Sequence, residues 1–269
     1  MALTNLQSEI LKLLADNRRQ TPGSYVAGGL ALNFVLGTPR ISRDIDIFHD
    51  SVEALFASWK ADREVLQLHG FTFKPLRELP RFLEADVSRG DEHTEIQWGT
   101  DSAYRFFPLV ENDITGFSLQ ALDLAANKLS ALVGRTEPRD WIDVITATRK
   151  LQPFACLLSA ACGKDPGFSP TTMLEYVARR HYNQTELDDR ILPRGVYNAE
   201  ELCRYWHDMV DRTREVLRYF PPEEVGKAVM TADGELFNGT DEELVTALKA
   251  GTLSFHEGHI GGVWPRIIG

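Results

Sequence analysis

The chain has 269 residues, and 29 lysines and arginines against 39 aspartates and glutamates give it a net charge of −10. With 43% hydrophobic and 25% charged residues, its composition is that of an ordinary globular protein and excludes a disordered or fibrous one. The most apolar stretch, residues 154–163, has half the roughly 20 residues that a membrane-spanning helix needs. Three cysteines without a CxxC pair argue against a disulfide scaffold or a structural zinc site. We therefore expect a cytoplasmic protein that makes no membrane contact.

The N-terminal half alternates between helix and strand patterns. Its first residues have apolar side chains at helical spacing, which predicts an amphipathic helix rather than a signal peptide. Isoleucines and aspartates then alternate over residues 44–48, which is typical of a strand. The remaining patterns predict a strand at 24–29, helices at 30–37 and 51–70, and strands at 71–76, 81–90 and 93–99, the last two forming a hairpin.

From residue 118 onward helical patterns dominate. We expect a helix over 123–134 with Asp123 as its N-cap, and another over 136–152 with Pro138 in its first turn. Further helices are expected at 169–180, at 198–220 and from Asp241, and Asp233-Gly234 predicts a small terminal β-hairpin. The prediction is thus an α/β domain at 1–117 followed by a mainly helical domain at 118–269.

Asp44 and Asp46 are the strongest candidates for a chemical role. Because side chains alternate along a strand, both carboxylates lie on one face, with Cβ atoms about 6–7 Å apart. Two such carboxylates repel each other unless a cation or solvent lies between them, and Mg²⁺ prefers oxygen ligands of this kind. The alternative is a solvated strand face without a ligand.

Gly28 and Gly29 stand between an expected strand and an expected helix. In such a turn the backbone amides can approach an anion closely, and the helix N-terminus favours negative charge. A tight turn without a ligand explains the same glycine pair. Together with the Asp-x-Asp strand, however, the pair supplies what nucleotidyl transfer needs, a cradle for a triphosphate beside a metal site.

This region resembles the nucleotidyltransferase superfamily related to DNA polymerase β, and more narrowly the AbiEii/AbiGii type of abortive-infection toxin. The superfamily pattern is an apolar residue, Gly and Gly or Ser, a spacer of about a dozen residues, and Asp-x-Asp or Asp-x-Glu. The spacer here, residues 30–43, is slightly longer. Arg40, Ser42 and the following DIDIF resemble the narrower family's R-x-S-x-D-x-D. The resemblance implies that Gly28, Gly29, Ser42 and Arg43 face the phosphates.

A second block, residues 123–145, resembles later motifs of the same family. The resemblance implies that Lys128 is a cation aimed at the triphosphate and that Asp140, next to Arg139, is a polar active-site contact or general base. Asp143 is then structural. Read without the resemblance, Lys128 is equally a lysine that covers apolar surface, and the aspartates are carboxylates that favour a helix N-terminus.

The superfamily's third carboxylate is expected on a strand beside Asp44 and Asp46. In TEIQW, Thr94, Ile96 and Trp98 form the apolar face, so Glu95 and Gln97 face the site, and Glu95 is the predicted metal ligand. If Gln97 is the aligned residue, metal binding is weaker. Glu84 and Asp86 on the preceding strand are the fallback.

The resemblance implies a nucleotidyltransferase fold, with a mixed, twisted sheet flanked by helices, and a Mg²⁺- or Mn²⁺-dependent enzyme. It would move NMP from an NTP such as ATP to a hydroxyl of a tRNA end, a protein side chain or a small molecule. It would act as a toxin with an antitoxin partner. A catalytically weakened nucleotide- or RNA-binding module is the main alternative, and an antibiotic-modifying nucleotidyltransferase is a third.

Overall fold

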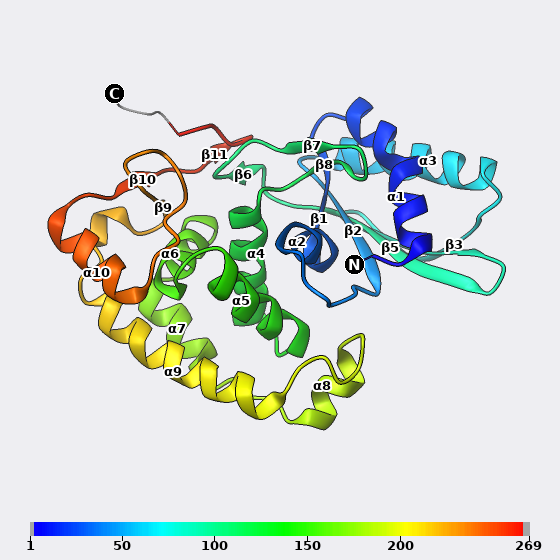
Figure 1. The fold of residues 1–269 in the computed structure, drawn as a ribbon. Helices are drawn as coiled ribbons and strands as arrows, with labels where there is room; N and C mark the ends of the chain where they lie inside the picture. The colour runs from blue at the N-terminus through cyan, green and yellow to red at the C-terminus, as the bar shows by residue number, and fades with distance from the viewer. Residues whose placement is uncertain (1–2, 266–269) are drawn as a thin grey trace. The chain divides into compact units, whose positions relative to one another are not determined.

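The computed structural model describes residues 3–265, which belong to two compact units (Figure 1). The first, here called the sheet unit, contains the residues up to Ala103 together with Phe107–Gln120 and Ile260–Gly262. The second, the helical unit, contains Tyr104–Phe106, Ala121–His259 and the residues from Val263. Among the residues described, no helix is long and apolar enough to cross a membrane.

A seven-stranded sheet in the order β3-β4-β5-β2-β1-β8-β7 forms the sheet unit. Its strands are β1 (Ser24–Ala27), β2 (Asp44–His49), β3 (Thr72–Leu79), β4 (Phe82–Arg89), β5 (Glu92–Thr100), β7 (Val110–Asn112) and β8 (Gly116–Ser118). β2 runs parallel to β5 but antiparallel to β1, and β1 runs parallel to β8. The predicted mixed sheet is therefore confirmed.

Two long helices, α1 (Asn5–Gln20) and α3 (Val52–Leu68), pack on one face of this sheet (Figure 1). α1 reaches that face through Gln7, whose Nε2 lies 3.4 Å from Thr94 Oγ1. α3 reaches it through Asp62, which accepts a hydrogen bond of 2.7 Å from Trp98 Nε1. Asp62 also forms a buried ion pair of 2.7 Å with Arg18 of α1. The apolar residues of β2 and β5 form the core beneath these helices, and the opposite face is left for the polar residues of the same strands.

The short helix α2 (Gly28–Leu36) begins two residues earlier than the sequence pattern predicted. Gly28 has φ +68°, a left-handed conformation that glycine adopts without strain, so the chain can turn directly from β1 into the helix. The preceding N-cap residue is Ala27, whose side chain cannot cap the helix. α2 ends at Leu36, close to the end at residue 37 that the sequence predicted, and its C-cap residue Gly37 is also left-handed.

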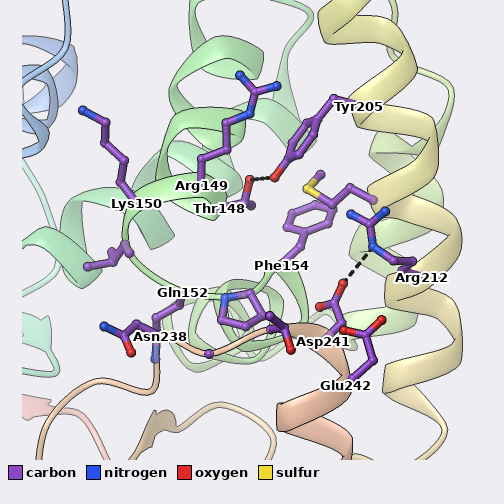
Figure 2. A pocket seen from close by; sticks show the side chains of 15 residues that line it. Thr148, Arg149, Lys150, Gln152, Phe154, Tyr205, Arg212, Asn238, Asp241 and Glu242 are labelled. Carbon is purple, nitrogen blue, oxygen red and sulfur yellow. Dashed lines mark hydrogen bonds and ion pairs between the residues drawn. The ribbon is translucent and has the colours of Figure 1, made fainter.

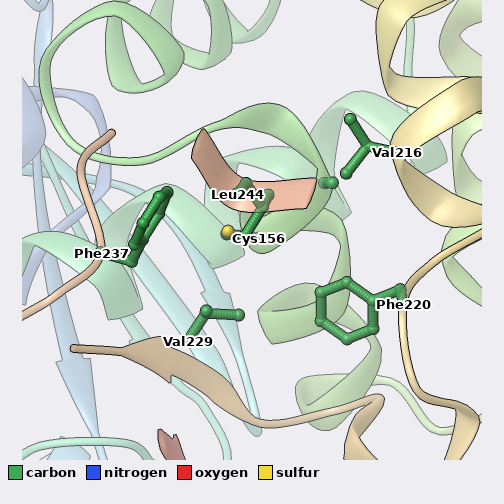
Figure 3. Packing of buried hydrophobic residues seen from close by; sticks show 7 residues of the cluster. Cys156, Val216, Phe220, Val229, Phe237 and Leu244 are labelled. Carbon is green, nitrogen blue, oxygen red and sulfur yellow. The ribbon is translucent and has the colours of Figure 1, made fainter. Parts of the chain in front are cut away.

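The helical unit is built around α6 (Phe154–Lys164), whose residues 154–162 are all buried, as expected of a helix that is apolar on every side. Figure 3 shows Cys156 of α6 among Val216, Phe220, Val229, Phe237 and Leu244. The other helices of this unit are α4 (Ala121–Gly134), α5 (Pro138–Lys150), α7 (Pro170–Ala178), α8 (Gln184–Arg190), α9 (Ala199–Leu217), the 3-10 helix η1 (Pro222–Glu224) and α10 (Asp241–Ala250). The remaining short strands are β6 (Tyr104–Arg105), β9 (Ala228–Met230), β10 (Ser254–His256) and β11 (His259–Ile260).

One local prediction in this unit was wrong. Asp123 is not an N-cap: it lies inside the first turn of α4, where its carboxylate accepts a hydrogen bond from the Phe106 amide and pairs with Lys164 at 2.8 Å. At the predicted Asp233-Gly234 hairpin the chain folds back on β9: Met230 and Leu236 form an antiparallel bridge, and the Phe237 amide donates to the Val229 carbonyl at 3.1 Å. β9 also pairs antiparallel with β10, and Phe237 belongs to the core cluster.

Candidate functional site

Gly28 lies against the carboxylate of Asp46. A Cβ atom added to Gly28 would come within 2.7 Å of Asp46 Cβ and 2.5 Å of its Cγ, so no other residue fits there without displacing the aspartate. Strand pairing explains the approach, because Ala27 is the register partner of Asp46. The first turn of α2 and the second aspartate of the Asp-x-Asp pair are therefore direct neighbours. The predicted juxtaposition of the diglycine turn and the carboxylates exists in the structure.

Asp44 and Asp46 share the face of β2 opposite to the fully buried Ile45 and Ile47. Asp44 is 8% exposed and Asp46 is half-buried. The Ser42 hydroxyl donates a hydrogen bond of 2.9 Å to Asp44 Oδ1, which orients that carboxylate. Ser42 thus contacts a predicted metal ligand, whereas the sequence placed it toward the phosphates. The predicted start of the strand at Asp44 is confirmed.

The loop before β2 is held by side chains from distant parts of the sheet unit. Gln7 Nε2 donates to the Ser42 carbonyl at 2.9 Å, and the Thr94 hydroxyl donates to the Arg43 carbonyl at 3.1 Å. On the other side of the loop, Asn33 Nδ2 donates to the Gly29 carbonyl at 2.5 Å, and Asn33 Oδ1 accepts a hydrogen bond from Thr38. The main chain on both sides of the carboxylates is therefore fixed. Sequence reasoning missed these supports.

The strand beside β2 carries the third-carboxylate candidates. Glu95 is the register partner of Asp44, and Gln97 is the partner of Asp46, so both lie on the carboxylate face as predicted. Glu95 is exposed, while Gln97 donates a hydrogen bond of 2.9 Å to the buried Glu84. Asp86 on β4 pairs with His93.

Across residues 3–265, no three histidine, cysteine, aspartate or glutamate side chains are grouped closely enough to hold a metal ion. Asp44 and Asp46 are thus a pair of carboxylates. Within residues 3–265, none of the candidates Glu95, Glu84 and Asp86 lies close enough to both of them to form a three-residue metal site. This donor set still fits Mg²⁺ or Mn²⁺, because Mg²⁺ in phosphate-processing sites is commonly bound by one or two carboxylates, substrate phosphates and water.

Lys128, Asp140 and Asp143 come together within the helical unit. Lys128 Nζ lies 3.1 Å from Asp140 Oδ1 and 3.5 Å from Asp143 Oδ2, and its side chain is 9% exposed. Arg135 completes the cluster, with its Nε 2.7 Å from Asp140 Oδ2. Sequence reasoning did not single out Arg135, whose only signal is its place between the two motif helices.

The electrostatics of Asp140 bear on its role. Burial raises the pKa of this carboxyl, but Lys128 and Arg135 more than offset burial and hold the pKa below its ordinary value. Asp140 therefore remains ionised and takes up protons poorly at neutral pH. Asp140 is therefore suited to hold the Lys128 ammonium and the Arg135 guanidinium in place rather than to accept a proton.

A separate cavity of about 600 Å³ lies in the helical unit, between the end of α5, α9 and the start of α10 (Figure 2). Both of its arginines are engaged with neighbours: the Arg149 guanidinium lies 4.1 Å from the Tyr205 ring centroid, and Arg212 pairs with Asp241 at 3.1 Å. None of the site residues predicted from the sequence lines this cavity.

Comparison with known proteins gives the chain its family. MenT4, a nucleotidyltransferase toxin from Mycobacterium tuberculosis H37Rv, is 15% identical with a TM-score of 0.47, and the match covers 76% of this chain and 85% of that one. JHP933 from Helicobacter pylori is 16% identical with a TM-score of 0.49, covering 80% and 95% respectively. No curated protein matches the sequence. The model of the family described as "Nucleotidyl transferase AbiEii toxin, Type IV TA system" matches residues 12–216. Because this match spans most of the chain, the protein belongs to the AbiEii nucleotidyltransferase toxin family.

Proposed function

We propose that this toxin-family nucleotidyltransferase transfers NMP from an NTP such as ATP to a hydroxyl acceptor, with a divalent cation held by Asp44 and Asp46. The observation that carries the proposal is the direct approach of Gly28 to Asp46, which sets the N-terminus of α2 beside the carboxylate pair. A helix N-terminus favours phosphate oxygens, and the carboxylates favour Mg²⁺ or Mn²⁺. We expect residues 1–117 to form the nucleotidyltransferase domain and residues 118–269 to form a second, mainly helical domain.

The residues of the sheet unit bind and orient the nucleotide in this account. The amides of Gly28 and Gly29 hold the triphosphate, and Ser42 keeps the Asp44 carboxylate in position through its 2.9 Å hydrogen bond. Arg43, which is exposed before β2, is a further phosphate contact. The metal, when bound, stabilises charge on the reacting phosphate oxygens. Glu95 remains the predicted additional ligand.

Lys128 and Asp140 have distinct roles in the proposal. Lys128 is the cation that meets the phosphates, and Asp140 is its positioning residue. The low pKa of Asp140 argues against the general-base role that the sequence left open. Asp143, at 3.5 Å from the ammonium, steadies the same lysine.

The acceptor is a tRNA end, a protein side chain or a small hydroxyl compound, and the family context favours an antitoxin partner. We further infer that the protein works in the cytoplasm without a membrane contact. The sharpest test is incubation with each of the four α-³²P-labelled NTPs, Mg²⁺ or Mn²⁺, and total tRNA or cell lysate. We expect label transfer by the wild type and by Asp16→Asn, an exposed control on α1, and at least 100-fold less by Asp46→Asn.

A catalytically weakened binding module is the second candidate. The engagement of the Gln97 amide with Glu84, and the lack of a three-carboxylate group among the residues described, favour it. NTP binding without label transfer for all four nucleotides would support this alternative and contradict the transferase proposal.

A further inference from the structure

The polar cavity of the helical unit has the size and the lining of a site for a small charged molecule (Figure 2). Its volume of about 600 Å³ lies within the range of about 300–1,000 Å³ that small-molecule sites have. Three cations line it against two carboxylates: Arg149, Lys150 and Arg212, and Asp241 and Glu242. Because the chain as a whole has a net charge of −10, this excess of positive charge is a local feature, and it favours an anion.

Both arginines of the cavity are held in place and still have donors for a ligand. The Arg149 guanidinium lies 4.1 Å from the Tyr205 ring centroid and 3.7 Å from Glu201, which is beyond hydrogen-bond distance. Arg212 donates from its Nε to Asp241 at 3.1 Å, which leaves its two terminal amino groups for other acceptors. Guanidinium groups suit a phosphate, because each can offer two parallel N–H groups to its oxygens.

Gln152 adds a hydrogen-bond acceptor that no residue within 3–265 satisfies. It lines the cavity and is only 2% exposed. Its Nε2 donates to the Val229 carbonyl at 2.8 Å and to the Phe237 carbonyl at 3.1 Å, whereas its Oε1 has no hydrogen-bond partner. Since the two bonds from Nε2 fix the amide, Oε1 is a fixed acceptor, and a buried acceptor without a partner is costly. A ligand that carries an N–H group as well as an anion would satisfy it.

The helix ends at the cavity add two further features. α6 begins at Phe154, which lines the cavity, and it has neither a side-chain cap nor an acidic residue in its first turn, so its N-terminus favours an anion. Glu242 lies in the first turn of α10 and is exposed. Carboxylates accept hydrogen bonds from ribose hydroxyls in known nucleotide sites. Phosphate, ribose and base therefore each find a matching group in this cavity.

We propose that this cavity binds a free ribonucleotide, at a site that shares no residue with the one proposed for the transferred nucleotide. Arg149 and Arg212 bind the phosphate, Gln152 Oε1 accepts an N–H of the base, and Glu242 accepts a ribose hydroxyl. Nucleotide binding here does not require the proposed transfer reaction, so the two can fail separately.

The test is calorimetric titration of the full chain with each of the four ribonucleoside 5′-monophosphates in EDTA. We expect saturable binding of at least one of them by the wild type and equally by Asp46→Asn. Arg149→Gln and Arg212→Gln should each weaken this binding about 10-fold or more, the usual effect of losing a hydrogen bond from a charged group. Urea unfolding shows that each variant is folded.

Arg204→Gln is the matched control. It removes the same charge from α9 at an exposed position outside the cavity lining, where Arg204 pairs with Glu200 at 3.1 Å. It should bind the nucleotide like the wild type.

Smaller probes separate a nucleotide site from a general anion site. Ribose 5-phosphate and inorganic phosphate should bind at least about 10-fold more weakly than the best nucleotide, because they lack the base that meets Gln152. The 2′-deoxy form of that nucleotide should bind more weakly than the ribonucleotide, because it offers Glu242 one hydroxyl fewer.

Affinity for inorganic phosphate equal to that for the nucleotide would overturn the proposal. It would also be overturned by the absence of saturable nucleotide binding, or by unchanged binding in both Arg149→Gln and Arg212→Gln. Loss of binding in Asp46→Asn would assign the signal to the carboxylate pair and contradict a second site. Nucleotide binding with no label transfer by the wild type would contradict the transfer reaction alone.

Discussion

Gly28, the first residue of α2, lies so close to Asp46 of β2 that a single methyl group at residue 28 would collide with the aspartate side chain. The contact joins the anion-binding end of α2 to the proposed metal ligands, and it explains why the turn begins with glycine rather than with a capping residue. Both the left-handed φ of +68° and the missing Cβ are needed.

Gly28→Ala should therefore disable the site and strain the fold. We expect a loss of label transfer of at least 100-fold and a decrease of about 1–3 kcal/mol in the free energy of unfolding, the usual cost of a forced backbone conformation. Gly134→Ala is the control, because a Cβ there meets no atom within 4 Å. Transfer assays and urea unfolding of both variants measure the effect; equal behaviour of the two would contradict it.

Asp140→Asn should destabilise the protein in a pH-dependent way. The substitution leaves the nearly buried Lys128 without its closest carboxylate, which costs about 3–5 kcal/mol at neutral pH. The pKa of Asp140 is lowered in the folded state. The ionised carboxylate therefore contributes fully to the free energy of unfolding above the ordinary pKa of 3.8, and this contribution is lost as the pH falls through the pKa of the folded state. The difference in unfolding free energy between wild type and variant, followed by urea titration, should shrink below about pH 4. A constant difference from pH 7 to pH 2 would refute this account of the cluster.

Glu95→Gln tests whether the exposed glutamate adds to the carboxylate pair. In the presence of NTP, we expect it to weaken Mn²⁺ binding less than Asp46→Asn does, because Glu95 is not gathered with the pair in the structure described. Glu92→Gln, at the start of the same strand and paired in register with Arg89, should leave binding unchanged. Electron paramagnetic resonance of Mn²⁺ reports the affinity. Wild-type affinity in Glu95→Gln would remove Glu95 from the ligand set.

The His49 ring should stay neutral at pH values well below the ordinary pKa of histidine. Burial is the main cause that lowers its pKa from 6.5 to about 4, while Nδ1 donates to the Gly99 carbonyl at 3.1 Å. The folded protein then binds this proton less readily than the unfolded chain, so stability is full above pH 6.5 and falls by about 3 kcal/mol as pH drops to 4. NMR titration of the ring should show the neutral form at pH 5, and His49→Gln should flatten the stability profile between pH 6.5 and 4. A His49 that is charged at pH 6 would contradict this prediction.

The sequence predicted those parts of the site that depend on local pattern. The alternation around Asp44 and Asp46 is a property of a single strand, and the glycine pair marks its own turn, so both could be read before the structure. Lys128 stands four residues from both Leu124 and Leu132, and all three are buried on the inward face of α4, as this helical spacing indicates.

The rest depends on long-range contacts that no local pattern encodes. Gln7 supports Ser42 across 35 residues, and Thr94 supports Arg43 across 51. Asp123 looks like a cap in sequence, yet its partners are Phe106 and Lys164. The third carboxylate was ambiguous for the same reason: strand register puts Glu95 and Gln97 on the site face, but side-chain orientation decides which oxygens can meet.

A crystal structure of the full chain with Mn²⁺ and a non-hydrolysable NTP analogue tests the central claim most directly. We predict an anomalous Mn²⁺ peak within coordination distance of carboxylate oxygens from both Asp44 and Asp46, with the triphosphate against the amides of Gly28 and Gly29. A metal bound elsewhere, or a triphosphate away from the N-terminus of α2, would contradict the account.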